Sequence, residues 1–388
     1  MSVSKINIVF ASLFSIVLLF PAVTVLFSDA EEENVEFRNK AEVPSFTIEG
    51  LLTYPGHLND YINDNFGGRS EIIACNSFIR IKLFNSSPNS RQVMLGKEGW
   101  LFLNEKEIHK IHDNLDPLTE KELKVFAHVE LERAEWLKLH GIDYYLVIPP
   151  VSHTIYEEYL PSNFKRHYDL TKRQQVIRYL KQHTSVKVID VDSILFANKK
   201  RHSLYYKTDT HWTFYGAYYT YTSMINEIRK DHKNIPAPIA EDKLSVYPSV
   251  TISNDLSRLI GLPGYLAQND TAIDIKNNCL KKIDCKTISS TSKNKLYVLQ
   301  FANKCDTSLP SMFMYRDSYA NYLYNFLGQH FDTTTVVWDT RFDPVQILKA
   351  KPDIVIYEAA EHLSMHLADL NHTAIRDELK SRGVKIYP

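Results

Sequence analysis

An aspartate and a histidine stand two positions apart in KTDTHWTFYGAYYTY, which covers residues 207–221. With one residue between them, the Asp209 carboxylate can reach Nδ1 of His211 from the same loop, and Nε2 is then free to face a nucleophile. Such a carboxylate holds the imidazole in one tautomer and stabilises the imidazolium. The alternative is an ordinary polar loop that contains a histidine, and these two residues alone leave both interpretations open.

A candidate nucleophile follows an apolar run much later in the chain. In SMFMYRDSYA, residues 311–320, the run ends at Arg316, Asp317 and Ser318, and a helix-like segment begins directly after it. Active sites of open α/β sheets gather at the carboxyl ends of strands, and backbone N–H groups at such a turn can stabilise an oxyanion. The alternative is that Asp317 or Ser318 only caps the helix.

Alternating strand and helix patterns predict how these groups are positioned. We expect strands in IDYYLVIPP, VKVIDV, KLYVLQFA, SMFMYRDS, TTTVVWD, PDIVIYE and VKIYP, and a hairpin at 93–103. We expect helices at 118–141, 169–183 and 215–230, in YANYLYNFLGQH, and across 54–84 with a Gly-Gly break at 67–68. Thr119 and Glu122 form a plausible capping box. This order predicts an α/β fold whose parallel sheet carries helices on both faces.

The N-terminus has the pattern of a membrane anchor. The run Ile6–Phe27 carries no charge and is long enough to span a bilayer. Lys5 precedes it and Glu31 opens an acidic stretch after it, so the positive-inside rule predicts a cytoplasmic tip and an exported body. A cleaved signal peptide is the alternative. The predicted division is 1–28 for the tip and anchor, 29–50 for a juxtamembrane linker and 51–388 for the exported domain, with an irregular insertion at about 233–310.

Composition narrows the class of protein. The 388 residues are 44% hydrophobic and 23% charged, with a formal net charge of −1, so no basic field favours a nucleic-acid partner. The four cysteines are Cys75, Cys279, Cys285 and Cys305. Cys279 and Cys285 could close a small disulfide loop in an oxidising compartment, and free thiols are the alternative.

Several segments together resemble a known family. TDTHWTFYGA resembles the DxHW signature of the alginate O-acetyltransferase (AlgX/AlgJ-like) group of SGNH-type hydrolases, and MLGKEGWLFL resembles its GKDGWLF hairpin. DYYLVIPPVSHTIYEEYLP, MFMYRDSYA and KPDIVIYEAAEHL resemble its first strand region, its nucleophile turn and its PDxVxxExxER strand. The segments follow the family's order from about residue 50 to the C-terminus, with the weakest match in 233–300.

The resemblance implies a fold, an activity and partners. It implies an SGNH/flavodoxin-like sheet in 51–388, with Ser318 as nucleophile, His211 as base and Asp209 as orienting acid. It also implies an acetyl-Ser intermediate and no cofactor. Family members are typically membrane-anchored and exported, here to the periplasmic side of the inner membrane. They acetylate exopolysaccharide beside a membrane-bound O-acyltransferase that delivers the acetyl group.

The chain departs from the family at two places, and other functions stay open. It has Pro150-Val151-Ser152 where Pro-Asn-Lys is common, and His362 where an Arg is expected. The same triad would serve a carbohydrate acetylesterase if water reached the acyl-enzyme. A non-catalytic, polysaccharide-binding scaffold is a further alternative, although the intact Asp-His-Ser set argues against it.

Other residues are weaker candidates. Trp212 and Tyr315 could wall a substrate pocket, and Arg316 and Arg341 could bind an anionic sugar, although core packing or structural pairing would explain each of them. A metal site at Glu361, His362 and His366, or at His109 and His112, is possible by residue type, but no further ligand cluster accompanies them and a solvated helix face is the favoured explanation. We therefore predict no metal site.

Overall fold

Five adjacent parallel strands form one side of a seven-stranded sheet in the computed structural model. The structure describes residues 3–25, 41–47, 50, 52–65, 68–105, 108, 117–164, 167–251, 255–263, 268–283, 297–364 and 373–386. The strand order is β4 (Lys187–Ile189), β3 (Asp143–Val147), β11 (Ile354–Glu358), β9 (Met312–Arg316), β10 (Thr333–Trp338), β8 (Tyr297–Asn303) and β7 (Leu280–Ile283). The first five strands are parallel, which confirms the predicted parallel sheet, while β8 and β7 extend it in antiparallel pairing.

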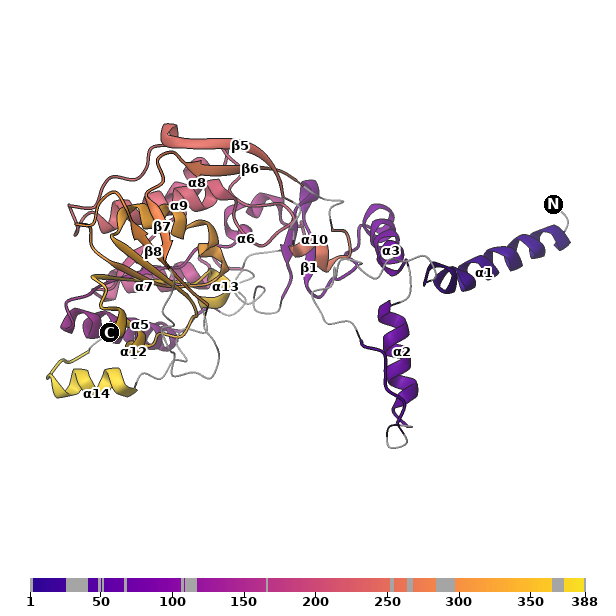
Figure 1. Ribbon diagram of the computed structural model, residues 1–388, viewed down its shortest axis with the longest axis horizontal. Helices are drawn as coiled ribbons and strands as arrows, with labels where there is room; N and C mark the ends of the chain where they lie inside the picture. The colour runs from indigo at the N-terminus through magenta and orange to yellow at the C-terminus, as the bar shows by residue number, and fades with distance from the viewer. Residues whose placement is uncertain are drawn as a thin grey trace.

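Helices cover both faces of this sheet, as the sequence pattern predicts (Figure 1). One face packs against α5 (Glu120–Leu139), α7 (Lys172–His183), α12 (Pro344–Ala350) and α14 (Thr373–Ser381). The other packs against α8 (Asp192–Asn198), α9 (Phe214–Ile228) and α11 (Tyr324–Leu327). Since side chains alternate along a strand, Phe313 and Tyr315 of β9 join the first core, and Met312 and Met314 join the second. Side chains on one face of the sheet are therefore separated from those on the other face by the sheet itself.

Local signals place most helix ends correctly. The predicted capping box is present at the start of α5, where Thr119 accepts from the Glu122 backbone and Glu122 accepts in return. YANYLYNFLGQH is not one helix but three short turns, η4 (Ser318–Tyr322), α11 and η5 (Gly328–His330), because Tyr, Asn and Phe are weak helix formers. The strand predicted in VKIYP is wrong for its described residues: Val384 and Ile386 pack against the core without pairing to a strand.

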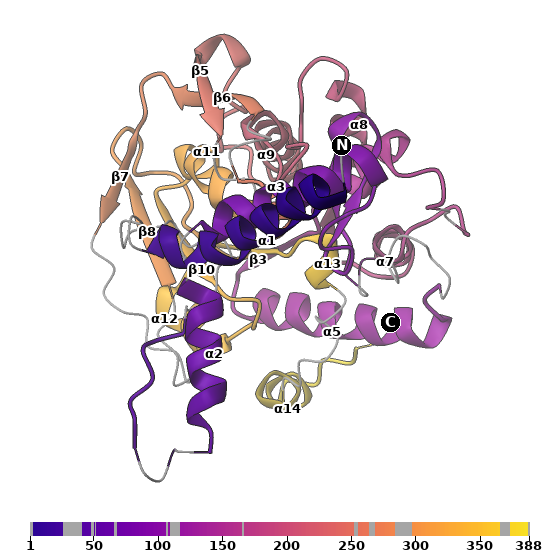
Figure 2. The same ribbon diagram turned by 90° about the vertical axis from the view of Figure 1, so that its right-hand side faces the viewer.

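The chain before the hairpin contains separate helices that lie beside the layered body (Figures 1 and 2). These are α1 (Val3–Val25), α2 (Tyr54–Asn65) and α3 (Arg69–Phe84), and Gly68, with φ +74°, precedes α3 at the predicted break. The predicted hairpin is present as β1 (Val93–Leu95) and β2 (Leu101–Leu103), joined by η1 (Lys97–Gly99). Across the ranges that the structure describes, no helix combines the length and apolar character needed to cross a membrane, so the predicted anchor is not confirmed.

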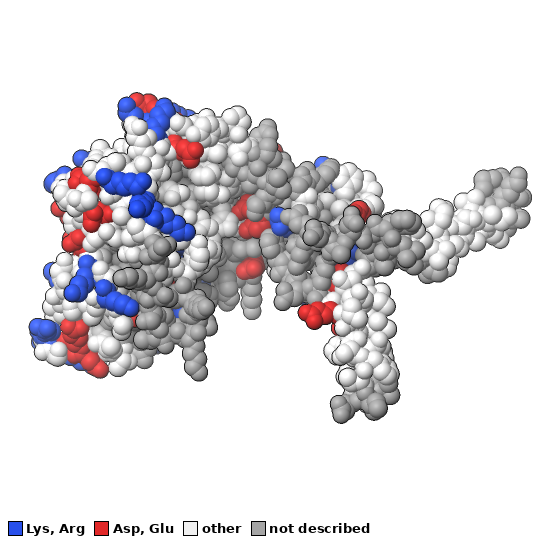
Figure 3. Space-filling model, in the orientation of Figure 1, with Lys and Arg blue, Asp and Glu red and all other residues white. Residues whose placement is uncertain are grey.

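The segment predicted as irregular contains a β-ladder and a short helix. Strands β5 (Leu244–Thr251) and β6 (Gln268–Ile275) pair antiparallel, and α10 (Asp255–Leu259) lies between them in the chain. Leu256 and Ile260 pack with β1, β2 and α3. The remaining short elements are α6 (Ser152–Ile155), η2 (Glu157–Tyr159), η3 (Glu241–Lys243) and α13 (Glu361–Ser364). Positive and negative side chains are interspersed on the visible face of the body (Figure 3), in keeping with the net charge of −1.

The disulfide differs from the predicted pair. Cys279 is bonded to Cys305, with Cα atoms 5.6 Å apart, whereas Cys285 lies outside the described residues. The pairing of β7 with β8 explains the choice: Leu280 lies opposite Asn303, and the Lys304 N–H donates to the Cys279 carbonyl. Cys279 and Cys305 are therefore brought together by the sheet, which short spacing in the sequence could not indicate.

Replacing Cys279 by serine should lower the free energy of unfolding by about 3 kcal/mol, because the bond closes a loop of 26 residues and restricts the unfolded chain. Urea unfolding followed by circular dichroism measures the change. Cys75→Ser is the matched control, because Cys75 is a free, exposed cysteine and its replacement should change stability little. Equal stability of the two variants would contradict a structural role for the disulfide.

Candidate active site

The structure brings Asp209, His211 and Ser318 into one chain of hydrogen bonds. His211 Nδ1 lies 2.7 Å from Asp209 Oδ1, and His211 Nε2 lies 2.8 Å from Ser318 Oγ. Because an ionised carboxylate only accepts, Nδ1 carries the proton and Nε2 is left to accept from the serine hydroxyl. These are the contacts expected from the sequence, and they are the geometry of an activated serine nucleophile.

Reciprocal hydrogen bonds hold the histidine loop against the serine turn. Trp212 Nε1 donates to the Tyr319 carbonyl at 2.9 Å, and the Tyr319 hydroxyl donates to the Thr210 carbonyl at 2.6 Å. Each bond joins a residue next to His211 with the residue after Ser318. A Cβ on Gly216, at the start of α9, would lie 2.3 Å from the Leu204 carbonyl oxygen, so only glycine fits there. The aromatic and glycine residues of the opening segment thus fix the base relative to the nucleophile.

Asp317 acts as the cap at the serine turn, which leaves the Ser318 hydroxyl for the histidine. Asp317 Oδ1 accepts from Tyr319 N at 2.8 Å, and Oδ2 accepts from Ala360 N at 2.7 Å. The Ser318 N–H opens η4 and has no acceptor within that turn, so it is suited to receive a developing oxyanion. Burial raises the pKa of Glu358, which accepts from Asp317 N, well above its usual range.

The surroundings of His211 favour its protonated form. Burial alone would lower its pKa, but the hydrogen bond and the charge of Asp209 outweigh burial and raise the pKa above the usual value. The Asp255 charge adds to this effect. A raised pKa makes Nε2 a stronger base once it is deprotonated, and it moves the pH at which the histidine becomes neutral upward.

Asp255, in the segment predicted as irregular, is a second carboxylate beside the pair. Its backbone N–H donates to Asp209 Oδ2 at 3.0 Å, and its carboxylate accepts from Thr210 N at 2.8 Å and from the Thr210 hydroxyl. Its Oδ2 lies 4.0 Å from His211 Nδ1. Burial and then the Asp209 charge raise the pKa of Asp255 to about 6. No motif in the sequence links Asp255 to Asp209, so only the fold reveals it.

The same three side chains lie close enough to hold a cation. One ligand-capable atom from each of Asp209, His211 and Asp255 lies within 4.8 Å of the others. However, both oxygens of both carboxylates already accept hydrogen bonds from protein donors. A bound metal would have to displace these donors, so the arrangement favours proton transfer over metal binding.

Replacing Asp255 by asparagine should shift the acidic limb of the kcat/KM profile to lower pH by roughly 0.5 to 1 unit. The variant removes a negative charge that raises the His211 pKa, so the histidine stays neutral, and able to accept a proton, down to a lower pH. Hydrolysis of a small activated ester across pH measures the shift. Asp306→Asn, in an exposed loop, is the control. A limb that stays in place or moves upward would contradict this role of Asp255.

Three of the four residues predicted to contact substrate have buried side chains, which contradicts that prediction. Trp212 is buried and braces the turn, as described above. Tyr315 is buried on the opposite face of the sheet, where its hydroxyl donates to the Asp343 carbonyl at 2.9 Å. Arg316 is buried on the face of the triad and donates to Asn321 Oδ1 at 2.6 Å. Arg341 is exposed and paired with Asp339 at 2.8 Å, so a substrate contact there stays a prediction.

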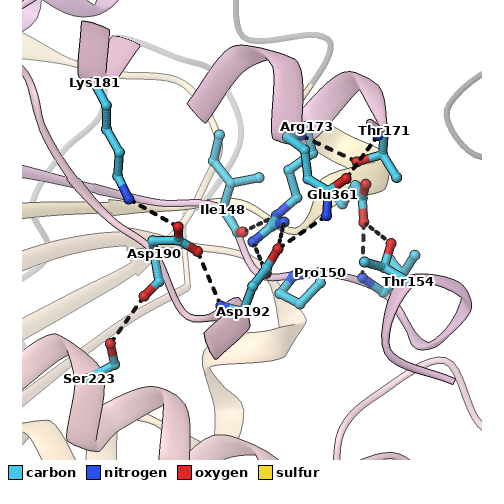
Figure 4. A network of polar contacts seen from close by, with 12 residues as sticks. Ile148, Pro150, Thr154, Thr171, Arg173, Lys181, Asp190, Asp192, Ser223 and Glu361 are labelled. Atoms are coloured by element: carbon cyan, nitrogen blue, oxygen red, sulfur yellow. Dashed lines mark hydrogen bonds and ion pairs between the residues drawn. The ribbon is translucent and has the colours of Figure 1, made fainter. Parts of the chain in front are cut away.

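The residues considered as metal ligands either contact other protein groups or lie outside the described residues. Glu361 is buried and accepts from Val151 N at 3.3 Å and from the Thr154 hydroxyl at 3.0 Å, within the network of Figure 4. His362 lies against Tyr319, with ring centroids 6.1 Å apart, and burial lowers its pKa. His109, His112 and His366 lie outside the described residues. Glu361 therefore joins strand ends and is not available as a metal ligand.

Comparison with known proteins identifies a matching family over part of the chain. Residues 93–274 match the family described as "ALGX: SGNH hydrolase-like domain, acetyltransferase AlgX". The matched segment includes Asp209, His211 and Asp255 and ends before Ser318, so the nucleophile rests on the geometry. None of the curated proteins compared with the chain matches it.

Solved structures with a similar fold include three bacterial proteins. PatB1 of Bacillus cereus has a TM-score of 0.51 at 17% identity, over 70% of this chain and 96% of that chain. The O-acetyltransferase domain of Pseudomonas putida AlgJ has a TM-score of 0.48 at 18% identity, over 73% and 95%. Pseudomonas aeruginosa AlgX has a TM-score of 0.48 at 17% identity, over 78% and 72%. The likeness to PatB1 supports the fold assignment alone.

Proposed function

We propose that this protein transfers acetyl groups to hydroxyls of a cell-surface polysaccharide. The premise is that residues 93–274 match the AlgX-type SGNH hydrolase-like, acetyltransferase family. The observation that carries the proposal is the hydrogen-bonded series Asp209–His211–Ser318, with distances of 2.7 and 2.8 Å. This geometry supports the roles of nucleophile for Ser318, which follows β9, and of base and orienting acid for His211 and Asp209, which precede α9.

In the first half-reaction the serine takes the acetyl group from a donor ester. Ser318 Oγ attacks the acetyl carbonyl carbon while its proton passes to His211 Nε2. The carbonyl oxygen becomes an oxyanion that the Ser318 N–H can stabilise. The intermediate collapses as the donor oxygen leaves and takes the proton from His211, which produces acetyl-Ser318 and the free donor alcohol.

In the second half-reaction a sugar hydroxyl replaces the serine. The hydroxyl oxygen attacks the acetyl carbon and gives its proton to His211 Nε2, and the new tetrahedral intermediate expels Ser318 Oγ, which recovers that proton. The products are an O-acetyl sugar and free enzyme. Asp209 stabilises the imidazolium in both halves and is not itself protonated.

An extracytoplasmic location is part of the proposal. The Cys279–Cys305 disulfide supports it, because such bonds persist in oxidising compartments. The uncharged run Ile6–Phe27 supports export and attachment to the inner membrane. We further propose that a membrane-bound O-acyltransferase supplies the acetyl group, because the chain would otherwise need a donor ester outside the cytoplasm.

The proposal can be tested by mass spectrometry. The full chain is first incubated with a small activated acetyl ester. We expect acetylation of Ser318 in the wild type and none in Ser318→Ala. Ser308→Ala, which alters an exposed serine, is the control and should still acquire the acetyl group on Ser318. Absence of acetyl-Ser318, with identical behaviour of Ser318→Ala, would overturn the catalytic role and favour a non-catalytic scaffold.

Adding polysaccharide to the same reaction separates transfer from hydrolysis. Acetylated glycan is the result expected for a transferase. Free acetate alone, at the same rate with and without glycan, would instead show that water resolves the acyl-enzyme and that the protein is an esterase. The triad serves both reactions, so the acceptor decides between them.

A further inference from the structure

One tryptophan differs from the other three in its exposure. Trp100, Trp136 and Trp212 are 3%, 1% and 0% exposed, whereas Trp338 is 46% exposed. Trp338 is the last residue of β10, at the carboxyl end of the parallel strands. A large aromatic side chain left in water at this edge of an α/β sheet lies where ligands usually bind.

The register of the sheet places Trp338 beside the nucleophile turn. β10 runs parallel to β9 with Trp338 opposite Arg316, and Ser318 follows Arg316 by two residues. Val336, two residues before Trp338, packs in the core on the face of the triad, so Trp338 points to that same face. The exposed ring and the serine therefore share one edge and one face of the sheet.

The ring is held in place before any ligand arrives. The Arg316 guanidinium carbon lies 4.3 Å from the Trp338 ring centroid. Arg316 is itself fixed, because its NH1 donates to Asn321 Oδ1 at 2.6 Å and to the Asp317 carbonyl at 3.1 Å. Tyr297, 57% exposed, lies edge-on with its centroid 6.5 Å from that of Trp338. An aromatic surface ordered in this way loses little entropy when it binds a ring.

Two charged residues follow Trp338 closely in the chain. Asp339 and Arg341 follow Trp338, and Arg341 NH2 lies 2.8 Å from Asp339 Oδ2. A pyranose ring has an apolar face of C–H groups and a rim of hydroxyls. An exposed indole suits the apolar face, and the charged residues that follow it in the chain offer hydrogen-bonding groups of the kind that hydroxyls bind.

We propose that Trp338 and Tyr297 form a subsite on which a pyranose ring of the acceptor polysaccharide stacks while a hydroxyl of the polymer reaches acetyl-Ser318. The choice of acceptor rests on the proposed function, whereas binding of a sugar ring to Trp338 does not. The subsite acts after acetylation of the serine, so it affects transfer to glycan and leaves the reaction with the donor unchanged.

Fluorescence quenching isolates Trp338 because the other tryptophans are buried. In the full-length Ser318→Ala variant, which binds without reacting, acrylamide should quench Trp338. A cello-oligosaccharide or a galacturonan oligosaccharide should protect it, whereas sorbitol, which has hydroxyls but no ring, should not. Trp338→Phe should lose the quenchable signal, which verifies its source. Quenching that neither oligosaccharide reduces would overturn the subsite.

Kinetics then test the role in transfer. Trp338→Ala should raise the KM for the oligosaccharide acceptor about tenfold and leave acetyl-Ser318 formation from a small ester unchanged, and Trp338→Phe should restore most of the affinity. Tyr247→Ala, which removes an exposed aromatic on β5, is the matched control. A wild-type KM for the acceptor in Trp338→Ala would overturn this inference and leave the proposed function standing. Protection of Trp338 without any acetyl-Ser318 would overturn the proposed function and leave the sugar site standing.

Discussion

Replacing His211 by alanine should slow the formation of acetyl-Ser318 by about 10⁴- to 10⁶-fold, which is the range found when one member of a serine triad is removed. The physical reason is that Ser318 Oγ then lacks the Nε2 acceptor now 2.8 Å away, so it must attack as a neutral hydroxyl. Single-turnover acetylation by a small activated ester, followed by mass spectrometry, measures the rate.

A second histidine provides the control for this experiment. His183→Ala, at the exposed end of α7, should acetylate at the wild-type rate. Circular dichroism of both variants should show native secondary structure, since His211 is partly exposed and fills no core position. If His211→Ala acquired the acetyl group as fast as the wild type, the base would have to be another residue.

Replacing Arg173 by leucine should lower the free energy of unfolding by about 3–5 kcal/mol, the loss typical when one partner of a buried ion pair is removed. Arg173 is fully buried; it donates from Nε to the Ile148 carbonyl at 2.6 Å and from NH2 to Asp192 Oδ1 at 2.6 Å. The leucine variant leaves the carboxylate and the carbonyl without this donor (Figure 4). Urea unfolding measures the loss.

Replacing an exposed arginine tests whether burial causes the loss of stability expected for Arg173→Leu. Arg201 pairs with Glu241 at 2.9 Å while its side chain stays largely in water, so Arg201→Ala should cost no more than about 1 kcal/mol. A loss in Arg173→Leu as small as that in Arg201→Ala would mean that the network near Glu361 does not stabilise the fold.

Most of the sheet and the central contacts of the site were predictable, because they depend on local patterns. Apolar runs of strand length gave β3, β9, β10 and β11, and capping residues gave the start of α5. Asp209 and His211 are two residues apart, so their contact depends on one loop. Ser318 was found because carboxyl ends of parallel strands meet at one edge. In each case a short segment carries the information.

The remaining features depend on contacts between distant segments, which a single sequence does not encode locally. Asp255 reaches Asp209 only because α10 packs on the β1–β2 hairpin and α3. Cys279 meets Cys305 through the register of β7 and β8, and Trp338 lies beside Arg316 through that of β10 and β9. The alternation of β9 decides that Tyr315 faces away from the triad. The sequence by itself thus determined which residues form the proposed triad, and only tertiary packing decided what surrounds it, because register and burial are properties of paired segments.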